Sequence, residues 1–160
     1  MNLDGRSILA AGMFLLITVA AYYPAKDAGF VFDDDMYVTA NPFMGTPEGL
    51  GKIWTGFAKD NYPHQYYPLT STAFWLQYWI WQDNPLGYHV VNVLLHAINA
   101  VLLWRVLKSL GMSGAWLGAA IFAVHPVHVQ SVVWISELKN VLSTIFVLLS
   151  MLLFLQYFGF

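Results

Sequence analysis

The chain has 160 residues, of which 58% are hydrophobic and only 10% are charged. Ordinary soluble domains carry roughly 25% charged residues, so a single soluble core cannot bury this much apolar surface. The net charge of −2 provides no basic field for nucleic acid, and the absence of cysteine excludes disulfides, thiolate nucleophiles and cysteine metal ligands. We therefore expect an all-α integral membrane protein.

Four stretches lack Asp, Glu, Lys and Arg and are each long enough to cross a membrane. About 20 apolar residues cross roughly 30 Å of hydrocarbon, because a helix rises about 1.5 Å per residue. The sequence predicts a single membrane module over residues 1–160, with a large loop at about 25–86 after its first span. The predicted transmembrane helices lie at about 7–25, 86–107, 113–130 and 140–159.

The first span resembles a signal peptide, because Arg6 precedes an apolar run that begins at Ile8. The residues Tyr22, Tyr23 and Pro24 nevertheless form a poor cleavage site, and three more spans follow. We expect an uncleaved first helix.

Three consecutive acids, Asp33, Asp34 and Asp35, follow the first span and come directly after apolar residues. Adjacent carboxylates near a low-dielectric boundary repel one another, so at least one should have a raised pKa unless a cation compensates. Such a group suits a general base or a metal ligand. The alternative is a solvated loop or a helix cap.

An aromatic segment at about 69–82 is predicted to form an interfacial helix. Pro63 and Pro68 interrupt the charge-free window between Asp60 and Asp83, and the remainder is too short to span a membrane. Its Trp and Tyr rings prefer headgroup depth. The alternative is a short tilted fifth span, which would move all later segments to the opposite side.

Polar residues recur along the second span at spacings of 3, 4 and 3. They form one face of a helix and comprise His89, Asn92, His96 and Asn99. Hydrogen bonding to neighbouring helices is the favoured interpretation. His96 is kept as a candidate site residue.

A second polar cluster lies between the third and fourth spans. His125 and His128 have the spacing of half a zinc site, but Pro126 and the lack of a third ligand favour hydrogen-bonded structural histidines. Glu137 and Lys139 lie at a membrane boundary, where charge is costly, so they are either functional or an interfacial ion pair.

Basic residues set the predicted orientation. Arg6, Arg105 and Lys108 flank short segments, which predicts that these segments are cytoplasmic. With four spans, the acidic loop and the 125–140 turn then emerge together on the non-cytoplasmic side.

Four segments, in this order and spacing, resemble the amino-terminal membrane region of the tetratricopeptide-repeat O-mannosyltransferase-like proteins. These are glycosyltransferases of the GT-C class, and the resemblance runs from about Phe30 to the end of the chain. The segments are FVFDDDMYVTANP, YYPLTSTAFWLQYWIW, GYHVVNVLLHAINAVLLW and HPVHVQSVVWISELKNVLS.

This resemblance implies transfer of a sugar from a polyprenyl-phosphate donor to a hydroxyl acceptor, by inversion, on the non-cytoplasmic side. Asp33 and Asp34 match the family's catalytic acidic pair, one of which would accept the proton of the acceptor hydroxyl. A divalent cation near the phosphate is compatible with this scheme but not required, and no metal-ligating residue is assigned. The expected substrate-binding residues are Asp35, His125, His128, Glu137 and Lys139.

The chain departs from the family pattern in two contacts and in length. Gln130 stands where the family commonly has an acid, and Leu138 stands near the place of an arginine, whereas Lys139 is retained. Family members continue through more helices and repeats. We therefore expect a partial or truncated module of a bacterial inner membrane, in which a partner chain would supply the missing helices.

Three functions follow as hypotheses. The first is a membrane glycosyltransferase module, and the alternative is a non-catalytic membrane interaction module that retains the fold. A transporter of metal or small solutes is disfavoured, because no inverted repeat is visible.

Overall fold

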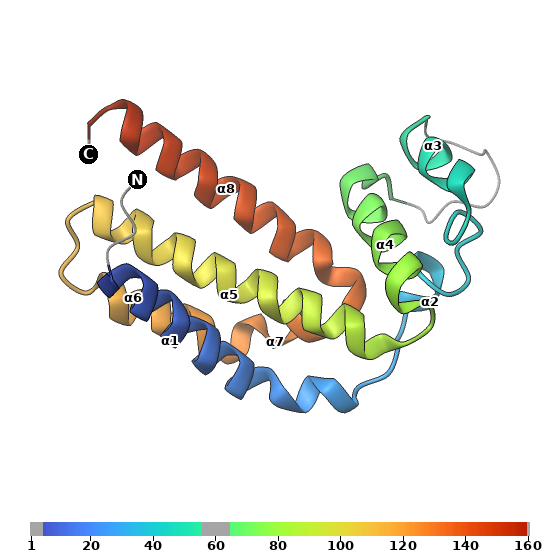
Figure 1. Cartoon of the computed structure of the whole chain (residues 1–160), viewed down its shortest axis with the longest axis horizontal. Coiled ribbons are helices and arrows are strands. Elements are labelled where there is room, and N and C mark those ends of the chain that lie inside the picture. The colour runs from blue at the N-terminus through green and yellow to red at the C-terminus, as the bar shows by residue number, and fades with distance from the viewer. Residues whose placement is uncertain (1–4, 56–64, 160) are drawn as a thin grey trace.

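The computed structural model describes residues 5–55 and 65–159. Within these ranges all regular structure is helical, which confirms the expected all-α fold (Figure 1). The elements in chain order are α1 (Gly5–Tyr22), η1 (Tyr23–Asp27), α2 (Asp34–Tyr37), α3 (Pro47–Thr55), α4 (Pro68–Trp81), α5 (Pro85–Ser109), α6 (Ala115–Val124), η2 (Pro126–His128), α7 (Val129–Val133), η3 (Ile135–Glu137) and α8 (Leu138–Tyr157).

Three helical segments in the described part are long and apolar enough to cross a membrane: Ser7–Asp27, Pro85–Ser109 and Ile135–Tyr157. A fourth candidate consists of α6 followed by Pro126–Val133, with a bend of 48° between them. The bend has a local cause, because a proline disfavours helical backbone at the residue before it, and His125 is extended (φ −67°, ψ 130°). The expectation of about four candidate spans is confirmed.

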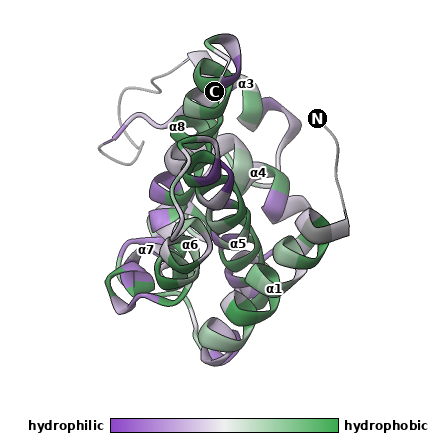
Figure 2. Cartoon of the chain, turned by 90° about the vertical axis from the view of Figure 1, so that its left-hand side faces the viewer, coloured by the Kyte–Doolittle hydropathy of each residue, from purple (hydrophilic) through white to green (hydrophobic). Residues whose placement is uncertain are grey.

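Helix α5 lies at the centre of the bundle and packs against α1, α6 and α8. Seen from one end, these helices lie beside one another and carry mainly hydrophobic residues (Figure 2). The four polar residues of α5 all contact backbone carbonyls of other segments. Two of these carbonyls lie in neighbouring helices, as the favoured interpretation of this stripe predicts, and two lie in the connections between helices. His89 Nε2 lies 3.2 Å from the Ala28 oxygen, Asn92 Nδ2 3.4 Å from that of Trp134, His96 Nε2 3.3 Å from that of Ala123, and Asn99 Nδ2 2.9 Å from that of Val141.

The helices α2, α3 and α4 gather at the end of the bundle where α5 and α8 begin (Figure 1). Proline in the first turn of α4 fits a helix start, because its missing N–H would have no partner there. The fully buried Phe74 ring of α4 packs against Tyr37 and Tyr88, with centroids 6.3 and 6.4 Å apart. Residues 56–64 of the predicted loop, Asp60 and Pro63 among them, lie outside the described residues.

Candidate functional site

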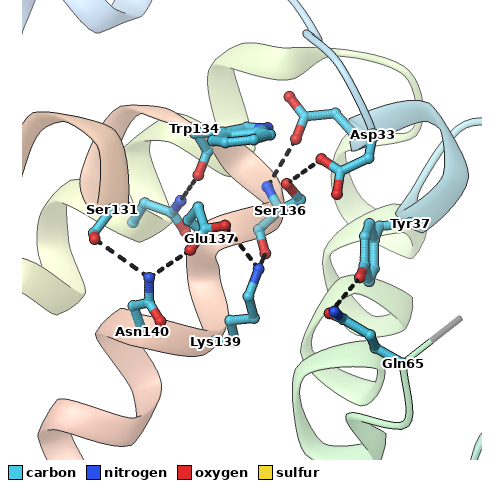
Figure 3. Close-up of polar contacts among 11 residues, drawn as sticks. Asp33, Tyr37, Gln65, Ser131, Trp134, Ser136, Glu137, Lys139 and Asn140 are labelled. Atoms are coloured by element: carbon cyan, nitrogen blue, oxygen red, sulfur yellow. Dashed lines mark hydrogen bonds and ion pairs between the residues drawn. The ribbon is translucent and has the colours of Figure 1, made fainter. Parts of the chain in front are cut away.

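The acidic loop is joined to the turn before α8 by direct hydrogen bonds. The Ser136 amide donates to Asp34 Oδ1 at 2.8 Å, and the Ser136 hydroxyl donates to Asp33 Oδ1 at 2.8 Å (Figure 3). These partners lie 102 and 103 positions apart in the chain. The fold thus brings two of the three consecutive acids to Ser136, which lies in the turn that carries the second polar cluster.

The local backbone geometry of the acidic loop and of the turn before α8 places the groups that form this contact. Asp33 is the N-cap of the short helix α2, and the Val31 amide donates to Asp34 Oδ2 at 2.9 Å. On the other side, Trp134 is extended (φ −76°, ψ 118°) and η3 begins directly after it. Amides in the first turn of a helix have no intrahelical acceptor, so the Ser136 N–H is available to a carboxylate.

The two carboxylates occupy different environments. Asp34 is fully buried, and each of its oxygens accepts a backbone N–H. Burial raises the pKa of Asp34, the Asp33 charge adds to this effect, and the hydrogen bonds from Val31 and Ser136 oppose it. The sequence predicts such a raised pKa for at least one acid, but burial rather than repulsion is the main cause. Asp33 is only partly buried, and Ser136 is its hydrogen-bond donor.

Phe32, immediately before this pair, is 87% exposed and has φ of +52°. Bulky L residues rarely adopt positive φ, and such a conformation costs on the order of 1–3 kcal/mol. Its ring centroid lies 5.2 Å from that of Trp134, with the planes at 52°. The buried Nε1 of Trp134 has no hydrogen-bond partner among the described residues. The strained backbone of Phe32 and the unpaired Nε1–H of Trp134 therefore both lie beside the acids.

A cation lies on the other side of Ser136 from the acids. Lys139 Nζ donates to Glu137 Oε1 at 2.8 Å and to the Ser136 carbonyl at 3.4 Å (Figure 3). The Asn140 amide donates to the second Glu137 oxygen and to Ser131 Oγ. The side chains of Lys139 and Glu137 are only 21% and 15% exposed, so they form a partly buried ion pair.

A groove of about 410 Å³ lies between the start of α4 and the first turns of α8, and Lys139 lines it. Lys139 Nζ is 5.9 Å from the Tyr67 ring centroid, while Leu142 and Phe146 contribute apolar wall. The first turns of two helices border the groove, and helix N-termini carry partial positive charge. This chemistry suits an anionic group attached to an apolar chain.

Three of the expected substrate-binding residues have partners other than Ser136 and the Lys139–Glu137 ion pair. Asp35 is exposed and accepts a hydrogen bond from Thr39 Oγ1 at 2.8 Å. His125 Nδ1 accepts the Val127 amide at 3.2 Å and so caps η2. The His128 ring packs against Phe122 and His96, with its centroid 4.4 Å from the Phe122 ring and 5.3 Å from the His96 ring.

Within residues 5–55 and 65–159, no group of three or more His, Asp or Glu side chains is placed to hold a metal ion.

The positions that depart from the family pattern differ in burial. Leu138 is fully buried in the core formed by the loop helices, α5 and the turn before α8. Gln130 is exposed on α7. Sequence patterns do not single out Phe32 and Trp134, since one aromatic residue among many carries no spacing signal.

Comparison with known proteins finds relatives that share one description, protein O-mannosyl-transferase. The chain is 30% identical to a protein O-mannosyl-transferase of Caenorhabditis elegans, over 93% of this chain and 24% of that protein. It is 29% identical to protein O-mannosyl-transferase TMTC3 of Homo sapiens, over 85% of this chain and 16% of that protein. It is 32% identical to protein O-mannosyl-transferase Tmtc3 of Drosophila melanogaster, over 90% of this chain and 19% of that protein.

The chain therefore spans about a quarter or less of the length of these relatives. These relatives are animal proteins, so they do not support the expected location in a bacterial inner membrane. They also do not support the expectation that a separate partner chain supplies further helices. No family model matches the chain, and no solved structure matches it.

Proposed function

Since the homologues of this chain are protein O-mannosyl-transferases, we propose that it forms part of a membrane glycosyltransferase of the GT-C class. This enzyme transfers mannose from a polyprenyl-phosphate donor to a hydroxyl group of a protein on the non-cytoplasmic side. The observation that carries the proposal is the docking of Asp33 and Asp34 on Ser136, next to the Lys139 groove.

In the proposed reaction Asp33 is the general base. Its carboxylate accepts the proton of the acceptor hydroxyl while that oxygen forms a bond to the anomeric carbon of the sugar. The bond between the anomeric carbon and the phosphate oxygen breaks, and the polyprenyl phosphate leaves with the electron pair, so the configuration inverts. Asp34 is buried and bonded through both oxygens, which suits a residue that positions Asp33 rather than one that reacts.

The donor occupies the groove between α4 and α8 in this proposal. Its phosphate lies near Lys139, and its isoprenoid chain runs along the apolar wall that includes Leu142 and Phe146. Lys139 already contacts the carbonyl of the serine that holds Asp33. Phosphate and base would thus both lie next to Ser136.

Replacing Lys139 with Ala should weaken binding of polyprenyl phosphate about 10- to 100-fold, the size of one charge-assisted hydrogen bond. Binding of uncharged polyprenol should hardly change, because only the phosphate interacts with the ammonium. Equilibrium binding of both lipids to the full-length protein in nanodiscs measures the difference.

The pairing of Lys139 with Glu137 calls for two controls. Lys139→Arg keeps the charge and should retain most of the affinity. A Lys139→Ala, Glu137→Gln double variant removes the carboxylate that the single variant leaves unpaired. Equal losses for polyprenyl phosphate and polyprenol would contradict a phosphate contact and leave lipid packing as the explanation.

The proposed topology places the acidic loop and the 125–140 turn on the same, non-cytoplasmic side. Single cysteines at the exposed positions Glu48 and Val127 should both react with an impermeant thiol reagent in intact cells. A cysteine at the exposed Met112, in the turn after α5, should stay unlabelled, because the 25 residues of α5 separate it by roughly 37 Å of helix. Labelling of Met112→Cys together with only one of the other two would rule out this topology.

A non-catalytic membrane module is the second candidate. It is favoured by Leu138, because a fully buried leucine stands near the place where the resemblance implies an arginine. A protein that binds polyprenyl phosphate through Lys139 but never transfers sugar would fit this alternative.

A further inference from the structure

Neither burial nor backbone preference accounts for a phenylalanine at position 32. At 87% exposure the ring gains little from burial, and φ of +52° favours glycine or asparagine over a bulky residue. A strained and exposed aromatic residue directly before Asp33 is better explained by a ligand that uses the ring.

The Phe32 ring is paired with Trp134, at a centroid distance of 5.2 Å. Phe32 precedes Asp33 by one residue and Trp134 precedes Ser136 by two, and the Asp33 carboxylate and the Ser136 hydroxyl are 2.8 Å apart. Figure 3 shows Trp134 beside Asp33 and Ser136 at the contact between the two segments. The aromatic pair therefore lies next to the carboxylate that the proposed reaction uses.

An aromatic surface beside carboxylates has the chemistry that recognises a hexose. A hexose ring presents a face of C–H groups, which packs on an aromatic ring by dispersion, and a rim of hydroxyls, which donate to carboxylates. Insertion of Phe32 into lipid is the competing explanation. Hydrocarbon is a poor environment for the adjacent Asp33, because charge there is costly.

We propose that Phe32 and Trp134 form a stacking surface that binds the sugar ring of the donor and holds its anomeric carbon near Asp33. This role rests on the proposed glycosyltransferase function and extends it, since it assigns sugar recognition to two residues outside the polar cluster.

The test compares Phe32→Gly with Phe32→Tyr in the full-length protein. Glycine accepts positive φ without strain, so Phe32→Gly removes the ring while the backbone keeps its conformation. Phe32→Gly should raise KM for polyprenyl-phosphate mannose about five- to tenfold, with a smaller change in kcat, the size of one aromatic contact. Phe32→Tyr keeps the ring and should behave like the unchanged protein.

Equilibrium binding separates the sugar from the lipid without any turnover. Phe32→Gly should weaken binding of polyprenyl-phosphate mannose and leave binding of sugar-free polyprenyl phosphate unchanged. Equal losses of affinity for both ligands, or no loss of affinity for either, would contradict the proposal that Phe32 and Trp134 bind the sugar. If the unchanged protein transfers no sugar, the proposed function fails, and this binding comparison still decides whether Phe32 recognises the sugar.

Discussion

Replacing Asp33 with Asn should lower the turnover of the full-length enzyme by roughly 10²- to 10⁴-fold, the usual contribution of general base catalysis. Asparagine has nearly the same shape, and its amide oxygen still accepts the Ser136 hydroxyl, which bonds Asp33 at 2.8 Å in the present structure. Only the ability to accept a proton is lost. Donor binding should therefore change little, and separate measurements of kcat and of equilibrium donor binding reveal this pattern.

Asp35→Asn is the matched control for this experiment. Asp35 lies two residues after Asp33, is exposed, and accepts a hydrogen bond from Thr39. Its replacement should leave turnover within about twofold of the unchanged enzyme, since surface substitutions away from special features have small effects. Unchanged turnover in Asp33→Asn would reject Asp33 as the base, and an equal loss in Asp35→Asn would point to general charge rather than position.

Replacing Asp34 with Ala should release the acidic loop from the turn before α8. The change leaves the amides of Val31 and Ser136 without their acceptor, and a buried N–H that loses its partner, as that of Ser136 does, costs about 1–3 kcal/mol. The variant should melt at lower temperature and expose the loop to protease. Turnover should fall as well, because Asp33 loses the neighbour that positions it.

Thermal unfolding and limited proteolysis in detergent distinguish this structural loss from a chemical one. Asp33→Asn should melt like the unchanged protein, whereas Asp34→Ala should not. Asp34→Asn keeps one acceptor oxygen and should lie between the two. An Asp34→Ala protein with unchanged melting and unchanged protease resistance would show that the loop is held by other contacts.

The helices that fill the bundle could be predicted because long apolar runs leave few other structures. The α5 stripe could also be predicted, since spacings of 3 and 4 place polar side chains on one helical face, and in the structure they reach the backbone of neighbouring segments. The start of α4 follows from Pro68, which fits the first turn of a helix.

The rings of His125 and His128 lie near each other, with centroids 6.4 Å apart, although the two residues do not share a continuous helix. An i, i+3 separation places two side chains on one face only inside a continuous helix. Pro126 makes His125 extended, so its ring caps η2 while the His128 ring packs on Phe122.

The contact between the acids and Ser136 could not be predicted from local patterns, because it joins segments more than 100 residues apart. The same limit applies to Phe32, whose significance depends on a backbone angle and on a distant tryptophan. The acidic triplet indicates a site, but the differences in burial and hydrogen bonding between Asp34 and Asp33 depend on the folded chain.

The most direct test of the proposed function is transfer of radiolabelled mannose by the purified full-length protein. The donor is polyprenyl-phosphate mannose of known anomeric configuration, and the acceptor is a peptide with hydroxyl side chains. The unchanged protein should form O-linked mannose of the opposite configuration, and Asp33→Asn should form almost none. Absence of an O-linked product, or a product that retains the donor configuration, would contradict direct displacement at this site.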